Sequence, residues 1–174
     1  MAAGSTKIFV SESFHYSVQY PVGWYYAGID QQFEIHSFPS EKAERGIVIP
    51  TSGADISITV PSQLVLNGLT SPATIEEFAQ FHTRRQRIVA QKNLVIRDSA
   101  RELSVTEVRT RCCGSKPLLY NVQWYFQIDG HLFNASLGYR DGDENAASFQ
   151  HVLEQIVLSL KTLPTMQRSP DPAR

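Results

Sequence analysis

A histidine and three arginines lie close together in the stretch "FHTRRQR", residues 81–87. They are His82, Arg84, Arg85 and Arg87. Guanidinium groups bind carboxylates and phosphates through paired hydrogen bonds, and the charge of a histidine changes near neutral pH. A basic cluster of this kind favours contact with an acidic protein surface or an anionic ligand. These four residues are therefore the candidate contact site of the chain.

A structural role is the competing interpretation of the same residues. If a helix runs from Thr74 to Val89, His82 and Arg85 fall on its apolar stripe with Ile75, Phe78, Phe81, Ile88 and Val89. Arg85 would then lay its stem on the core and pair its head with a carboxylate, and His82 would be a core or boundary histidine. Arg84 and Arg87 would face solvent. No aromatic residues interleave with the arginines in a pattern typical of nucleic-acid binding.

The acidic stretch "DGDEN" has the spacing of the first three ligands of a calcium loop, at Asp141, Asp143 and Asn145. An EF-hand loop also needs glycine at its sixth position and glutamate at its twelfth, where this chain has Ala146 and Val152. The EF-hand template therefore fails. The acids are expected to begin the next helix, where they meet the positive end of its dipole. We predict no metal site and no cofactor.

Enzyme motifs are missing from the sequence. There is no G-x-S-x-G, no H-E-x-x-H, no phosphate-binding loop and no dinucleotide fingerprint. The adjacent Cys112 and Cys113 would point to opposite faces of a strand, so a bond between them would be strained. No histidines flank them at zinc-ligand spacing, and we interpret them as ordinary thiols. The expected class is a non-enzyme, with a hydrolase site assembled from distant residues as the less favoured alternative.

Alternating apolar residues predict the strands that must position these side chains. In "FHYSVQYPVGWYY" the face of Phe14, Tyr16, Val18 and Tyr20 is apolar, Pro21 ends the strand, and Trp24 anchors the return in the core. Further strands are predicted over residues 32–38, 54–60, 92–96 and 102–113. Residues 39–53 are expected to form a loop with a short strand "GIVI", and residues 61–73 a second loop.

The clearest element is a hairpin over residues 118–139. Asp129-Gly130 forms its two-residue type I′ turn, which flanking apolar strands favour. This turn sets the cross-strand pairs as Ile128 with His131, Phe126 with Phe133, Trp124 with Ala135, Val122 with Leu137 and Tyr120 with Tyr139. A slip of one residue would turn this apolar set towards water. The hairpin therefore predicts an antiparallel sheet with one covered face and one wet face.

Two helices are predicted to cover the apolar face. The first begins at Thr74, a good N-cap with Glu77 at the capping-box spacing. The second runs from about Asn145 to Thr162 and gathers Phe149, Val152, Leu153, Ile156, Leu160 and Leu163 on one side. The order of elements predicts an α+β fold, a single antiparallel twisted sheet with helices packed on it. We expect a flexible N-terminus over residues 1–6, one domain over residues 7–163 and a disordered tail over residues 164–174.

With these elements placed, the chain resembles the PsbP-like family. The resemblance rests on "FHYSVQYPVGWYY", on "GADISITVPSQ" followed by "TIEEFAQF", and on the closing hairpin with "FQHVLEQIVLSLK". Together these stretches span most of residues 9–161, and the most specific part is Tyr-Pro-x-x-Trp at Tyr20 to Trp24. The resemblance implies a PsbP-like sandwich. It also implies a non-catalytic binding or assembly role, in a superfamily that includes a Ran-binding nuclear import factor.

Bulk composition narrows the classes of partner. The chain has 174 residues, 42% hydrophobic and 19% charged, with a net charge of −1, which is typical of a soluble globular domain without a field that recruits nucleic acid. No stretch approaches the roughly 18 apolar residues of a membrane span, and the sequence begins without a leader pattern. We expect a cytoplasmic protein as written, or one outside the cytoplasm if a leader was removed.

The expected function is binding of a protein partner, without contact to nucleic acid and with the oligomeric state left open. Tyr25, Tyr26 and the loop at residues 39–53 are further places where a partner could dock. The alternative is a pocket protein for a small anionic or apolar molecule, held in a cavity between sheet and helix lined by aromatic residues and Arg85.

Overall fold

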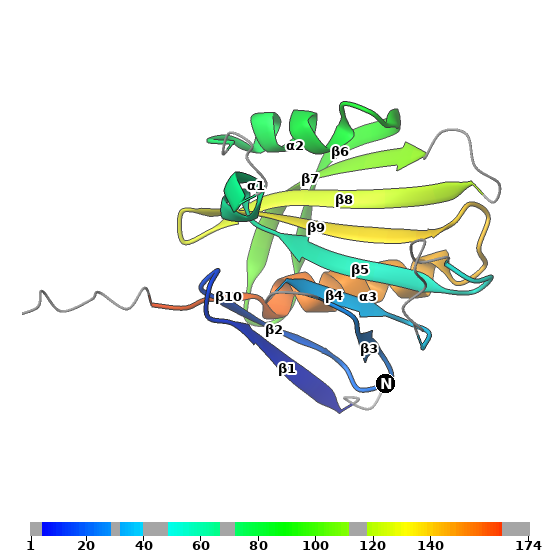
Figure 1. Ribbon diagram of the computed structural model, residues 1–174, viewed down its shortest axis with the longest axis horizontal. Helices are drawn as coiled ribbons and strands as arrows, with labels where there is room; N and C mark the ends of the chain where they lie inside the picture. Colours follow the sequence, from blue (N-terminus) through cyan, green and yellow to red (C-terminus); the bar gives the residue numbers. More distant parts are fainter. Residues whose placement is uncertain (1–4, 29–31, 40–48, 67–71, 112–117, 165–174) are drawn as a thin grey trace, which may run out of the picture.

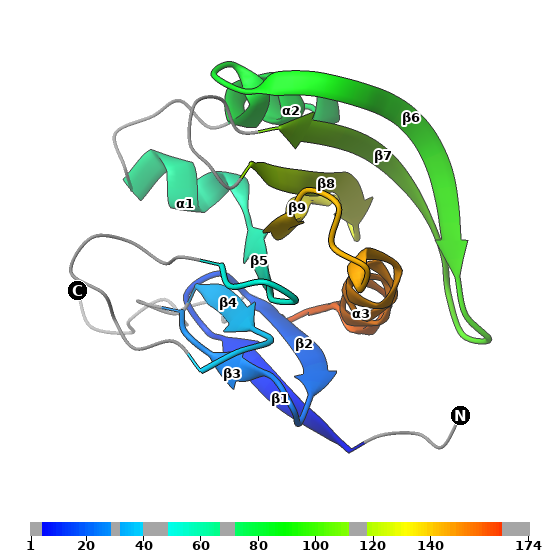
Figure 2. The same ribbon diagram turned by 90° about the vertical axis from the view of Figure 1, so that its right-hand side faces the viewer.

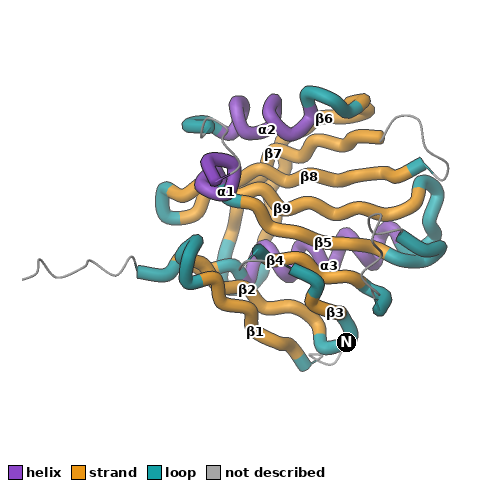
Figure 3. Tube along the Cα trace, in the orientation of Figure 1, coloured by secondary structure: helices purple, strands orange, loops and turns teal. Residues whose placement is uncertain are grey.

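The computed structural model describes residues 5–28, 32–39, 49–66, 72–111 and 118–164 (Figure 1). In this part of the chain the strands are β1 (Thr6–Ser11), β2 (Tyr16–Pro21), β3 (Tyr25–Tyr26), β4 (Phe33–His36), β5 (Ala54–Thr59), β6 (Arg87–Arg97), β7 (Glu102–Arg111), β8 (Leu119–Ile128), β9 (His131–Arg140) and β10 (Lys161–Thr162). The helices are α1 (Pro61–Leu66), α2 (Ile75–Thr83) and α3 (Ala146–Ser159). The α+β class expected from the sequence is therefore confirmed, with strands predominating (Figure 3).

The strands form two sheets rather than the single sheet that we predicted. The larger has seven strands in the order β3-β4-β5-β9-β8-β7-β6, and the smaller has three in the order β1-β2-β10. All of their pairings are antiparallel. Pro21 and the turn at Gly23 separate β2 from β3, so the chain leaves the small sheet there and enters the large one. This change of sheet is the physical reason that the strands do not form one layer.

The β8–β9 hairpin has the predicted register. Asp129 and Gly130 have φ values of 49° and 80°, the two positive angles that a type I′ turn requires. All five predicted cross-strand pairs are present, from Ile128 with His131 to Tyr120 with Tyr139. The face of the large sheet that carries Val122, Trp124 and Leu137 is called here the inner face, because these residues belong to the main core. The face that carries Asn121, Gln123 and Gly138 is called the outer face.

Each face of the large sheet carries a helix, which corrects the prediction of two helices on the same side and of one wholly wet face. On the inner face, α3 packs with Phe149, Leu153 and Ile156 in the main core, between the two sheets (Figure 2). On the outer face, α2 packs Phe78 against Tyr125 of β8, with ring centroids 5.7 Å apart. The stripe of α2 is apolar as predicted. It packs on the side chains of β7 and β8 that point to the outer face, not on the inner face.

The first predicted helix ends earlier than expected. Its N-cap is Thr74, whose side chain accepts from the Glu77 N–H as predicted, while the Glu77 carboxylate accepts from the N–H of Ala73. The helix stops at Thr83, and Ile88 and Val89 belong to β6 instead of the helical stripe. The expected loop at residues 61–73 also contains a helix, α1.

The opening strand keeps its predicted apolar face from Tyr16 onward, although Phe14 lies in the turn before it, and the strand that precedes this turn was missed. Tyr16, Val18 and Tyr20 of β2 are buried, and Trp24 packs edge-on against Phe149 of α3. Thr6 belongs to β1 and pairs with Pro21 of β2, so the prediction of a flexible segment is wrong for residue 6. The described residues do not include residues 1–4, the "GIV" of "GIVI", Cys112, Cys113 or residues 165–174.

A polar network joins β7 to α3 within the inner core. Glu107 of β7 is only 1% exposed, and its carboxylate accepts from Trp124 Nε1 at 2.9 Å and from Arg109 Nε at 2.6 Å. Arg109 also donates to Gln150 Oε1 of α3 at 3.2 Å. The long β6–β7 hairpin bends over α3 (Figure 2), and Arg101 beside its tip donates to the carbonyl of Leu160 at the end of α3. These contacts fix the hairpin on the helix.

Candidate functional site

The four predicted contact residues are separated by the structure. Arg84 is the C-cap of α2 and lies over the ring of Phe81, with its guanidinium carbon 4.6 Å from the ring centroid. Arg85 lies exposed in the turn after α2, and Arg87 is the exposed first residue of β6. Arg85 therefore does not line a cavity beneath the helix, as the alternative of a pocket protein required, because the helix ends before it. The arginines share one exposed segment, whereas His82 faces the sheet.

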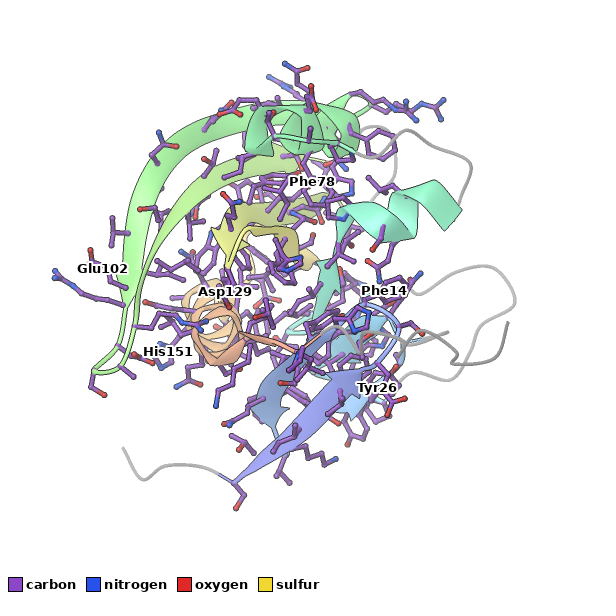
Figure 4. All side chains as sticks on the ribbon, turned by 90° about the vertical axis from the view of Figure 1, so that its left-hand side faces the viewer. Phe14, Tyr26, Phe78, Glu102, Asp129 and His151 are labelled. Atoms are coloured by element: carbon purple, nitrogen blue, oxygen red, sulfur yellow. The ribbon has the colours of Figure 1, made fainter. Side chains whose placement is uncertain are left out.

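His82 lies among aromatic rings on the side of α2 that faces the sheet. Its ring centroid is 4.9 Å from that of Phe78, 5.7 Å from that of Phe81 and 6.0 Å from that of Tyr125. Figure 4 shows Phe78 pointing from α2 into the space between helix and sheet. Burial lowers the pKa of His82 to about 4, because the apolar surroundings disfavour the charged ring. This environment agrees with the structural interpretation of His82.

The low pKa of His82 predicts a measurable effect on stability in acid. The unfolded chain takes up the proton near pH 6.5 and the folded protein only near pH 4, so stability falls as the pH drops through this window. His82→Phe removes this penalty. We expect the variant to gain about 1–3 kcal/mol relative to the parent between pH 7 and pH 4.5, measured by urea unfolding. His151→Phe, at an exposed position of α3, serves as the control, and parallel pH curves for the parent and His82→Phe would contradict the prediction.

A different cluster of titratable side chains lies on the outer face, beyond the part that α2 covers. One row of cross-strand partners runs from His36 of β4 to Asp55 of β5, Gly138 of β9 and Asn121 of β8. Glu34 lies two residues before His36 and therefore points to the same face. These residues surround a pocket of about 270 Å³, lined by Glu34, His36, Ile49, Asp55, Leu119 and Asn121.

The His36 ring is held by its neighbours on one side only. The side chain is fully buried, and its ring stacks on that of Phe38 with centroids 5.1 Å apart. Its Nε2 lies 2.9 Å from Oε1 of Glu34, whose side chain is 36% exposed. Its other nitrogen, Nδ1, has no hydrogen-bond partner among the described residues. A buried polar atom without a partner costs about 1–3 kcal/mol, so an unsatisfied imidazole nitrogen at a pocket wall is a signal of binding.

Gly138 lets two polar side chains of the pocket lining approach each other. A Cβ at this position would overlap Oδ1 of Asp55 and would lie 3.1 Å from Oδ1 of Asn121. The Asp55 carboxyl and the Asn121 amide therefore lie over the glycine from its two neighbouring strands. A glycine in a strand often marks such a close approach.

Burial raises the pKa of Asp55 to about 7, and the nearby carboxylate of Glu34 acts in the same direction. Removal from water disfavours the anion, and a second negative charge disfavours it further. Asp55 therefore exchanges its proton near neutral pH. A carboxyl group that titrates there, beside an imidazole whose buried Nδ1 has no partner among the described residues, can accept and release protons or bind a hydrogen-bond donor.

Metal binding is not supported by the geometry of the described residues. These residues contain no group of three or more His, Cys, Asp or Glu side chains arranged to hold a metal ion. Of the candidate calcium residues, Asp141 pairs with Arg111 at 3.1 Å, and Asp143 accepts from the N–H of Asn145 in the turn before α3. Asn145 itself is the N-cap position of α3 but makes no side-chain capping hydrogen bond.

Sequence reasoning did not find the pocket, although part of its signal was present. The alternation of apolar and polar residues in β5 indicates that Asp55 points outward, and the alternation in β4 indicates the same for Glu34 and His36, because Phe33 and Ile35 are buried. The segment between β4 and β5 is too long to set their register as a two-residue turn does. For this reason, the sequence alone could not show that His36 and Asp55 are cross-strand neighbours.

Comparisons with known proteins give no name to this site. No family model matches the chain, and no curated protein matches it. Among solved structures, the chain is similar to a protein from Bacteroides thetaiotaomicron VPI-5482, with 11% identity and a TM-score of 0.48 over 96% of this chain. This chain spans about half of that protein's length, 51%. A likeness at this level gives no information on ligand or activity. Among the described residues, no helix is long and apolar enough to cross a membrane.

Proposed function

We propose that this chain is a non-catalytic binding module of the PsbP-like type, which holds a group of a protein partner in the pocket of Glu34, His36, Asp55 and Asn121. The observation that carries the proposal is the fully buried imidazole of His36, whose Nδ1 has no partner among the described residues and which lines the pocket. A bound group that satisfies this nitrogen would remove the cost of leaving it unpaired. The two carboxyl groups of the pocket repel phosphates, which favours a protein over nucleic acid.

A hydrolase is the alternative that one observation favours. Glu34 orients the ring of His36 through Nε2, as carboxylates orient the imidazoles of catalytic triads. A hydrolase would also need a nucleophile that reaches Nδ1 when substrate is bound. Turnover of an ester or peptide that is lost in His36→Gln would support this alternative over the binding module.

A fragment screen tests whether the pocket binds anything. Small cationic, anionic, neutral and aromatic fragments are titrated against the protein and followed by amide chemical shifts. We expect at least one chemical class to shift amides around His36, Asp55 and Asn121, and this response to disappear in Asn121→Leu, which fills the pocket. Gln127→Leu, an exposed position on the same strand, is the matched control and should bind as the parent does. No response at the pocket from any class would overturn the proposed function.

A further inference from the structure

The walls of the pocket present hydrogen-bond acceptors and negative charge. Glu34 and Asp55 contribute carboxyl groups to the lining, Asn121 contributes an amide, and His36 contributes its imidazole. The two other residues of the lining, Ile49 and Leu119, are apolar, so the described lining contains no lysine or arginine. An electrostatic environment of this kind favours a cation that donates hydrogen bonds.

The neutral form of His36 also favours a donor in the pocket. The carboxylate of Glu34 only accepts, so the Nε2 that lies 2.9 Å from it carries the hydrogen. In the neutral ring the other nitrogen, Nδ1, then has a lone pair and no proton. The group that completes its hydrogen bonding must therefore donate.

One arginine lies beside the lining and is already engaged outside it. Arg140 of β9 donates from Nε to the carbonyl of Ile49 at 2.8 Å and from Nη1 to Oγ1 of Thr51 at 3.2 Å. It supports the segment that closes one side of the pocket and does not neutralise the carboxyl groups. The positive charge must be supplied from outside the described residues.

We propose that this pocket binds a cationic nitrogen group, a primary ammonium or a guanidinium such as a lysine or arginine side chain carries, and releases a proton on binding. This inference rests on the proposed function, for which it names the chemistry of the ligand. The pocket, with a volume of about 270 Å³, accommodates the end of one side chain rather than a drug-sized molecule.

The proton comes from the carboxyl group of Asp55. Before binding, Asp55 faces Glu34 and His36 of β4, while β9 contributes only Gly138 and β8 contributes the uncharged Asn121. With a pKa of about 7, Asp55 is protonated in about half of the molecules at neutral pH. A cation beside it favours the anion, so the O–H bond breaks, the proton passes to solvent, and an ion pair with the ligand remains.

The experiment uses four probes of similar size, namely methylammonium, methylguanidinium, acetamide and acetate, each titrated at pH 6, 7 and 8 with amide chemical shifts as the readout. We expect the two cations to shift the amides of His36, Asp55 and Asn121. Their dissociation constants should fall about tenfold from pH 6 to pH 8, as linkage to one proton with a pKa near 7 requires. In Asp55→Asn the pH dependence should disappear and cation binding should weaken, whereas Glu12→Gln, an exposed acid between β1 and β2, should change neither.

The outcomes separate this inference from the function on which it rests. Binding of acetate or acetamide as tightly as the cations would overturn the cationic ligand and leave the binding module standing. Cation binding that does not change with pH would overturn proton release. No response from any probe, together with a negative fragment screen, would overturn both this inference and the proposed binding module. Asn121→Leu keeps the charges of the pocket while filling it, so loss of cation binding there assigns the shifts to the pocket even if Asp55→Asn is unstable.

Discussion

Replacing Glu107 by alanine is expected to lower the free energy of unfolding by about 3–5 kcal/mol, the usual cost of removing one partner from a buried charged pair. The carboxylate accepts from Trp124 Nε1 and Arg109 Nε, and Lys92 Nζ lies 3.5 Å away. Alanine would leave the indole N–H buried without an acceptor and the guanidinium without its counter-charge. Urea unfolding at pH 7 measures the loss.

Two comparisons make this prediction specific. Glu102→Ala on the same strand removes a carboxylate that is 66% exposed and 3.9 Å from Arg97, and it should change stability by less than about 0.5 kcal/mol. Figure 4 shows Glu102 projecting away from the molecule. Glu107→Gln keeps an acceptor for Trp124 and should lose less than alanine does. Equal losses at positions 102 and 107 would show that the network contributes nothing.

The pH dependence of Glu107 supplies a further check on the same network. Burial by itself would raise the pKa of Glu107, but hydrogen bonds from Arg109 and Trp124 overcome this effect and hold the pKa below its usual value. A lowered carboxyl pKa means that the stabilisation is present at neutral pH and is lost as the pH falls through the folded-state value. The difference between the parent and Glu107→Ala should therefore narrow in acid.

Asp55→Asn is expected to have the second large effect, with the opposite dependence on pH. The folded protein holds the Asp55 proton up to about pH 7, whereas an unfolded chain releases it near pH 3.8. The folded state therefore binds more protons between these values, and the contribution of Asp55 to stability falls as the pH rises through this window. Relative to Asp55→Asn, the parent should lose about 2–3 kcal/mol between pH 5 and pH 8.

The comparison with the variant isolates Asp55 from the other titrating groups. His82 contributes a slope of opposite sign below about pH 6.5, but it is present in both proteins and cancels from the difference. Glu12→Gln removes the same formal charge at an exposed site and should reproduce the parent curve. Curves of the parent and Asp55→Asn that stay parallel from pH 5 to pH 8 would show that Asp55 titrates as an ordinary carboxyl.

Local signals in the sequence were enough to predict the hairpin but not the end of α2. The Asp129-Gly130 turn fixes its own register over both flanking strands, so each cross-strand pair follows from two residues. After Thr83 the apolar residues satisfy both a helical stripe and a strand, because Ile88 and Val89 are adjacent. The pairing with β7 decides in favour of the strand, because it extends over all of β6, from Arg87 to Arg97. The prediction of a helix did not take this pairing into account.

The candidate site shows the same limit at longer range. The alternation in β4 and β5 gives the outward face of Glu34, His36 and Asp55, which is local information. Whether they meet depends on the register between two strands whose connection exceeds a dozen residues, and on the adjacency of β9, which is almost 80 residues further along the chain. The opposite holds for the cluster of Arg84, Arg85 and Arg87. These residues are close together along the chain, so the cluster is visible in the sequence without knowledge of the fold.

The outermost position of β6 in the large sheet has a consequence for how this protein behaves at high concentration. The edge of this 11-residue strand that faces away from β7 has no strand partner among the described residues, and the backbone groups of an edge of this kind can pair with another extended chain and seed insoluble assemblies. The register shift between Ile88 and Ala90 interrupts the regular spacing of those groups, and Lys92 places a charge in the middle of the strand. Irregularity and charge thus keep the rim of the sheet from recruiting a foreign strand, a protection that Lys92→Val would weaken.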